Sequence, residues 1–152
     1  MCRNGMAKGQ NNSLQVLRCN RIETELYQEL TALWDSAGIS NPARADSLEA
    51  IRVTLDHGGC LILARDVTAG LCGSAWLTHD YRRVYVHHMA VLPSLQNSGI
   101  GTAILREALL IADEMGYQAK LEVLAQNPAA RHLYASHGFT DLDGYITMIR
   151  RK

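Results

Sequence analysis

The spacing of apolar residues changes its period along the chain, and this change limits the fold more than any other feature of the sequence. Between residues 22 and 37, apolar side chains recur every three or four positions, as on one face of an amphipathic helix: Ile22, Leu26, Leu30, Leu33 and Ala37. A second stripe follows Asn41-Pro42, a capping residue with proline at the first helical position, and ends at Gly58-Gly59. From Cys60 to Leu92 the pattern instead predicts strands joined by short turns. Two helices therefore precede an antiparallel meander.

The remaining elements complete an α/β domain. The sequence predicts a strand at 13–19, a third helix from about Gly99 to Met115, a strand at 119–125, a short helix that starts at Asn127-Pro128 and closes at Gly138, and a last strand at 144–149. This order indicates a mixed, mainly antiparallel sheet of six to seven strands with four helices packed on it. The polar segment 1–12 is predicted to be a disordered leader, and 13–152 a single domain.

Composition and charge exclude several classes of protein. Fifteen basic and fifteen acidic residues balance, so no general attraction to nucleic acid or an anionic membrane is expected. The longest apolar runs, 60–64 and 108–112, are about a quarter of a transmembrane span, and residues 1–13 lack the apolar stretch of a signal peptide. The cysteines form no C-x-x-C pair and have no histidine at ligand spacing, which predicts free thiols and no metal site: Cys2, Cys19, Cys60 and Cys72. We expect a cytoplasmic protein without nucleic-acid or membrane partners.

A loop with two glycines, Gly99 and Gly101, connects the strand that ends near Val91 to the third helix. The N–H groups of a helix's first turn have no intrahelical partner and lie at the positive end of the helix dipole, while glycine lets a backbone approach a ligand closely. Such a loop can hold a phosphate, although an ordinary glycine-rich helix entry has the same residues. No lysine follows Gly101, as a Walker A loop requires, and Ile104 stands where the dinucleotide fingerprint needs a small residue.

The sequence Gln96-x-x-Gly99-x-Gly101 after a strand is followed about 25 residues later by the segment 127–139, which runs from Asn127 through Ala130 and Tyr134 to Gly138-Phe139. The first resembles motif A of the GNAT superfamily of acyl-CoA-dependent N-acetyltransferases, and the second is similar to its motif B. The resemblance implies the GNAT fold over nearly all of residues 14–150, with two central strands that splay apart to form a slot for coenzyme A. It also implies transfer of an acetyl group from acetyl-CoA to a primary amine by direct attack, with no metal.

The resemblance further implies roles for residues of both motifs. The loop would hold the coenzyme A pyrophosphate through its backbone amides: Gln96, Asn97, Ser98, Gly99, Ile100, Gly101 and Thr102. Backbone groups of Met89 and Val91 would pair with the pantetheine amides, and the Met89 N–H would donate to the thioester carbonyl. Asn127 would bond the pantetheine arm or the entry of the short helix, and Ala130 would leave room for the cofactor.

Two further roles concern protons. Tyr134 matches the tyrosine that often protonates the departing thiolate, and its reference pKa of about 10 suits a general acid, although an aromatic packing role is the alternative. The acceptor amine must lose a proton, and the strand before motif A offers only His87 and His88 for this. With unbroken alternation His87 shares a face with Met89 and Val91. A β-bulge would shift that alternation, so His88 stays a candidate, as does a water chain beside a structural histidine pair.

The acceptor is the least constrained part of the prediction. Balanced charge favours a small-molecule amine, with a protein N-terminus or lysine side chain as the alternative. A non-catalytic coenzyme A binding module would keep the loop at 96–102 but would have no need of Tyr134. A homodimer is possible because it is common in the family.

Overall fold

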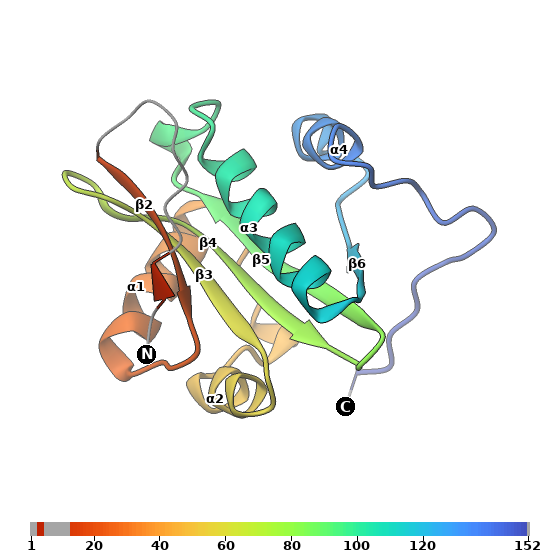
Figure 1. Ribbon diagram of the computed structural model, residues 1–152, viewed down its shortest axis with the longest axis horizontal. Coiled ribbons are helices and arrows are strands. Elements are labelled where there is room, and N and C mark those ends of the chain that lie inside the picture. The colour runs from red at the N-terminus through yellow and green to blue at the C-terminus, as the bar shows by residue number, and fades with distance from the viewer. Residues whose placement is uncertain (1–2, 5–12, 152) are drawn as a thin grey trace. The chain divides into compact units, whose positions relative to one another are not determined.

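A computed structural model describes residues 3–4 and 13–151 (Figure 1). The chain divides into two compact units, one up to Leu121 and the other from Glu122 onward. The first unit contains β1 (Arg3–Asn4), β2 (Leu14–Cys19), α1 (Thr24–Ser36), α2 (Leu48–Asp56), β3 (Cys60–Asp66), β4 (Gly70–His79), β5 (Arg83–Val91), α3 (Ile100–Met115) and β6 (Gln118–Leu121). The second contains α4 (Pro128–Ala135). Three of the four predicted helices, α1, α3 and α4, are confirmed near their predicted bounds.

The sheet has the strand order β1-β2-β3-β4-β5-β6. Neighbouring strands are antiparallel from β1 to β5, and β6 runs parallel to β5, so the predicted mixed, mainly antiparallel sheet is confirmed. The strand count of six to seven is not matched. Five strands of four to ten residues form the sheet, β2 to β6, and β1 adds only a two-residue pairing at its edge.

The predicted last strand at 144–149 accounts for part of this difference, because the segment forms no strand. Its apolar side chains are exposed: Tyr145, Ile146, Met148 and Ile149. Apolar patterning predicts which face of a strand would be buried, but a strand exists only where another strand pairs with its backbone. Of the predicted leader, only Arg3–Asn4 is described, as β1, and residues 1–2 and 5–12 lie outside the described part.

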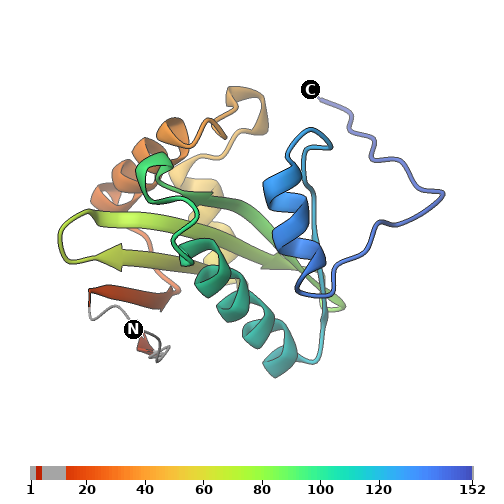
Figure 2. The same cartoon turned by 90° about the horizontal axis from the view of Figure 1, so that it is seen from above.

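Each face of the sheet carries its own core. Alternation along β3 sends Ile62 and Ala64 to the face covered by α3, and Leu61 and Leu63 to the face covered by α1 and α2 (Figure 2). Gly73 in β4 lets α3 approach closely, because a Cβ there would lie 2.7 Å from the Cδ1 of Ile104. This contact places the start of α3 beside the ends of β4 and β5.

The second helix begins later than the sequence predicts. Asn41 caps only the 3₁₀ turn Pro42–Arg44, and Ala45 then has a φ of +57°, which ends that turn. The hydroxyl of Ser47 caps the true start of α2. The predicted continuous helix from Asn41 is therefore wrong. The error matters because Asp46 lies in a loop instead of on a helix.

No helix in the described part of the chain is long and apolar enough to cross a lipid bilayer.

Candidate functional site

Strand β5 contains a β-bulge at its histidines. The pairing register with β4 shifts between His87 and Ala90, so that His88 and Met89 lie opposite a single residue of β4. His88 has a φ of +49°, an unusual value for a residue other than glycine. The backbone at this point is therefore held by its surroundings.

The bulge places both histidines on the face covered by α1 and α2. The ring centroid of Trp76, which belongs to that face, lies 5.7 Å from that of His87 and 5.6 Å from that of His88. Met89 and Val91 pack instead with the core on the α3 face. The prediction that His87 shares a face with Met89 and Val91, which assumed unbroken alternation, is wrong because the extra residue reverses the alternation beyond it.

A chain of side-chain hydrogen bonds supports the bulge. The buried hydroxyl of Ser74 in β4 accepts the indole N–H of Trp34 at 3.0 Å and donates to the carbonyl oxygen of His88 at 3.3 Å. The Trp34 and His88 rings lie 4.5 Å apart. Sequence reasoning assigned no role to Ser74, whose only signal is a hydroxyl inside the otherwise apolar buried part of β4, residues 71–77.

His88 lines a cavity of about 430 Å³ next to α1. Helix α1 contributes Tyr27, Trp34 and Asp35 to its wall, and the loop before α2 contributes Asp46. In the part of the chain that the structure describes, neither carboxylate forms an ion pair with a lysine or arginine. The cavity therefore combines aromatic surface with two carboxylates and an imidazole.

The imidazole of His88 is paired with the carboxylate of Asp46. Its Nε2 lies 2.8 Å from Asp46 Oδ2, and the His88 side chain is 6% exposed. Its Nδ1 is buried and has no hydrogen-bond partner among the described residues. Burial lowers the pKa of His88 below its ordinary value; the negative charge of Asp46 opposes this shift and the positive charge of Arg44 adds to it. This shift favours the neutral form of the His88 imidazole.

His87 has different surroundings. Its Nε2 lies 2.8 Å from the hydroxyl oxygen of Thr78, and the described lining of the cavity does not include it. Of the two candidate histidines, the structure brings His88 to the cavity with the carboxylates.

The loop before α3 has the geometry expected of an anion-binding loop. Asn97 and Gly99 have φ values of +61° and +89°, and no side chain caps the start of α3. A Cβ built on Gly99 meets no heavy atom within 4 Å, so the space beside the helix start is open. The side chain of Gln96 donates back to the carbonyl oxygen of Val91 at 3.3 Å, which ties the loop to the end of β5. These features fit a phosphate group at the first turn of α3.

Motif B lies in the second unit. The side chain of Asn127 accepts the N–H of Ala130 at 3.0 Å, which agrees with the predicted bond at the entry of the short helix. The Tyr134 ring lies edge-on to Phe139, with centroids 5.9 Å apart, and burial raises the pKa of Tyr134 above its ordinary value. Its predicted position beside the thioester stays a prediction.

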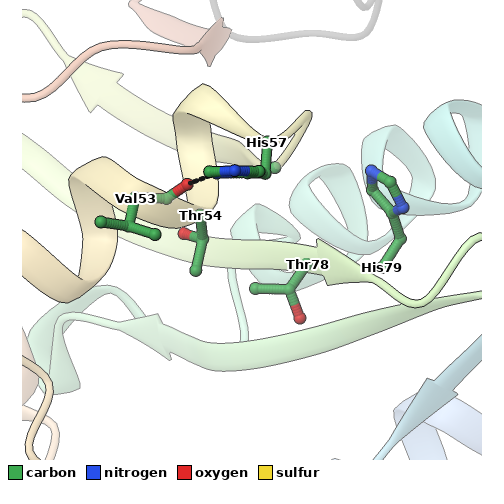
Figure 3. Close-up of a pocket in the computed structure, with 6 residues that line it drawn as sticks. Val53, Thr54, His57, Thr78 and His79 are labelled. Atoms are coloured by element: carbon green, nitrogen blue, oxygen red, sulfur yellow. Dashed lines mark hydrogen bonds between the residues drawn. The ribbon is translucent and has the colours of Figure 1, made fainter.

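A smaller pocket of about 230 Å³ lies between the end of α2 and β4 and contains two histidines (Figure 3). His57 Nδ1 donates to the carbonyl oxygen of Val53 at 2.7 Å, which leaves a lone pair on its Nε2. His79 Nδ1 accepts the N–H of Tyr81, so its Nε2 carries the proton when the ring is neutral. Within residues 3–4 and 13–151, no group of three or more potential metal ligands occurs.

Comparisons with known proteins agree with the motifs. The model of the acetyltransferase (GNAT) family matches residues 16–139. Mycothiol acetyltransferase of Clavibacter sepedonicus is 35% identical over 82 residues, which are 53% of this chain and 27% of that protein. The chain thus spans about a quarter of the length of this curated relative.

Solved structures resemble the chain over most of its length. A GNAT family acetyltransferase from Streptococcus pneumoniae TIGR4 is 26% identical with a TM-score of 0.70, covering 91% of this chain and 98% of that one. A GNAT family acetyltransferase from Elizabethkingia anophelis, solved with acetyl-CoA bound, is 21% identical with a TM-score of 0.60, covering 86% and 78%. The second likeness is one of fold.

Proposed function

This chain belongs to the acetyltransferase (GNAT) family, and from that premise we propose that it transfers the acetyl group of acetyl-CoA to the primary amine of a small molecule. The observation that carries the proposal is the pairing of two features in one unit: an open, glycine-containing helix start and a cavity that presents carboxylates and an imidazole. A volume of about 430 Å³ lies in the range of small-molecule sites. This size favours a small acceptor over a protein chain.

Residues 97–102 and the end of β5 would hold the donor. The backbone amides at the start of α3 would bind the pyrophosphate, because the helix dipole favours negative charge there. Pairing between β5 and β6 runs only from Arg83 with Gln118 to Val86 with Leu121. The backbone groups of Met89 and Val91 lie beyond that pairing, which supports their proposed bonds to the pantetheine arm. The Met89 N–H would stabilise the charge that develops on the acetyl carbonyl oxygen.

Acetyl-CoA supplies the acetyl group as an activated thioester, and the side chains of this chain would move the protons. His88 would take a proton from the acceptor's ammonium, directly or through one water, so that the free amine forms the new C–N bond as the C–S bond breaks. Tyr134 would give its phenolic proton to the thiolate, and its raised pKa keeps it protonated at neutral pH. The nitrogen loses its second proton as the amide forms, and this proton would restore the Tyr134 phenol, directly or through water. Because the bulge brings His88, and not His87, to the lining of the cavity, we prefer His88 as the base.

The test measures release of coenzyme A thiol from acetyl-CoA with a panel of amines: an aliphatic diamine, an arylalkylamine, an amino sugar and peptides with a free N-terminus or a lysine. Thiol release with at least one small amine and not with the peptides supports the proposal. Acetyl-CoA binding by calorimetry without thiol release would identify a non-catalytic module, and a preference for peptides would overturn the assigned acceptor. A cytoplasmic location, expected from the composition of the sequence, and a homodimer, expected from the family resemblance, stay predictions.

A further inference from the structure

We propose that Asp46 is a positioning residue that makes Nδ1 of His88 the proton-accepting atom of this site. The inference rests on the proposed function, because it assumes that His88 is the base. It concerns a residue pair 42 positions apart that no motif contains.

The first argument is the tautomer of His88. An ionised carboxylate can only accept hydrogen bonds, so the 2.8 Å contact with Asp46 Oδ2 requires the proton to be on Nε2. The remaining lone pair is then on Nδ1. Because Nδ1 is buried without a partner among the described residues, a proton there in the neutral ring would be an unsatisfied donor. Both ring nitrogens therefore favour the same tautomer.

The second argument is the cost of charging a buried ring. His88 packs against Trp34 and Trp76, and its side chain is 6% exposed, so an imidazolium there receives little stabilisation from water. Asp46 supplies a full negative charge at hydrogen-bond distance, and its own side chain is 20% exposed. Two other charged groups lie nearby. The positive charge of Arg44 disfavours the imidazolium, with a smaller effect than that of Asp46, and Asp35 lines the same cavity without a hydrogen bond to His88. Two further titratable groups lie near His88: Tyr27, which also lines the cavity, and His87, which precedes His88 in β5.

The third argument is that the loop holds Asp46 in place through its backbone. The phenolic hydroxyl of Tyr27 donates to the carbonyl oxygen of Asp46 at 3.0 Å. Ala45 before it has a left-handed conformation, and Ser47 after it caps α2. Replacing the carboxylate by an amide leaves all three features intact, so the substitution isolates the charge.

The proton balance is as follows. One N–H bond of the acceptor's ammonium breaks and its proton goes to Nδ1 of His88, while the lone pair stays on the amine nitrogen. The Nε2–H bond to Asp46 is retained, so the product is an imidazolium–carboxylate pair. Nδ1 has no solvent-exposed surface before the acceptor binds, so the acceptor, or a water that it brings, must displace the groups that cover this atom. The Nδ1 proton then leaves by the same route, which restores the neutral ring.

The experiment compares Asp46→Asn with the matched control Asp35→Asn, a carboxylate of the same cavity that is not bonded to His88. The pKa of His88 is measured by ¹H–¹³C NMR titration of the full chain, with its signal assigned from the spectrum of His88→Ala. The pH dependence of kcat/KM is measured with acetyl-CoA and the best small amine of the panel. We expect Asp46→Asn to lower both the NMR pKa and the kinetic inflection by about one pH unit or more, and Asp35→Asn to lower them by less.

The outcomes separate the inference from the proposed function. An unchanged His88 pKa in folded Asp46→Asn, or an equal shift in Asp35→Asn, would overturn the role of Asp46. A His88 pKa that falls while the kinetic inflection stays in place would overturn His88 as the base. Parallel shifts of both readouts in Asp46→Asn alone support both.

Discussion

The hydroxyl of Ser74 offers the most direct test of how the bulge is held. It is fully buried, accepts the indole N–H of Trp34 and donates to the carbonyl oxygen of His88. Ser74→Ala removes one oxygen atom and keeps the remaining side-chain carbon, so it leaves only a small void. The indole N–H of Trp34, whose side chain is buried, then has no acceptor.

The expected loss of stability follows from that unpaired donor. A buried polar group left without its partner costs about 1–3 kcal/mol. The carbonyl oxygen of His88 also loses a donor, so we expect Ser74→Ala to lower the free energy of unfolding by about 2–3 kcal/mol. For a chain of this size, about 2–4 °C of Tm corresponds to each kcal/mol, which predicts a decrease of roughly 4–12 °C.

Urea and thermal unfolding, followed by circular dichroism, measure this loss. The control is Ser36→Ala on α1, whose exposed hydroxyl donates to the carbonyl oxygen of Ala32. Its removal should change the free energy of unfolding by no more than about 0.5 kcal/mol. If Ser74→Ala loses no more stability than Ser36→Ala, the hydrogen bonds of Ser74 do not support the bulge.

Three further predictions concern the proposed chemistry. Gly99→Val should weaken acetyl-CoA binding at least about tenfold by calorimetry, whereas Gly116→Val, equally left-handed at the other end of α3, should not; equal effects would show general strain. Tyr134→Phe should lower kcat about 100-fold with acetyl-CoA affinity kept, and a wild-type kcat when chemistry limits would remove Tyr134 from the mechanism. His88 can accept a proton from the acceptor only when its imidazole is neutral. The value of kcat/KM should therefore rise with pH through the pKa of His88, which burial lowers below its ordinary value. His88→Ala should abolish this inflection and His87→Ala should keep it; the reverse result would restore His87 as the base.

Contiguous residues determined much of this molecule by themselves. The loop at 96–102 joins a strand to a helix, and its left-handed residues and uncapped helix start depend only on its own residues, so the motif was sufficient to predict its geometry. The cap of α4 is equally local, since Asn127 bonds a backbone N–H three positions away. In α1 and α3, apolar side chains recur with the period of a helix, which places them on one face that packs against the core. This pattern can be read from the sequence without knowing what the face packs against.

The remainder depended on partners that are distant in sequence. A bulge is one extra residue in a pairing between two strands, so the pattern of β5 alone could not show that His88 faces the cavity. The segment 144–149 has the pattern of a strand, but pairing requires an edge that its own residues do not supply. The pair of Asp46 and His88 required Asn41 to cap only a short turn, Ala45 to end it and α1 to lie over β5. Local chemistry decides which groups are available, and tertiary packing decides which of them meet, because the energy of a hydrogen bond or an ion pair depends on distance in space and not in sequence.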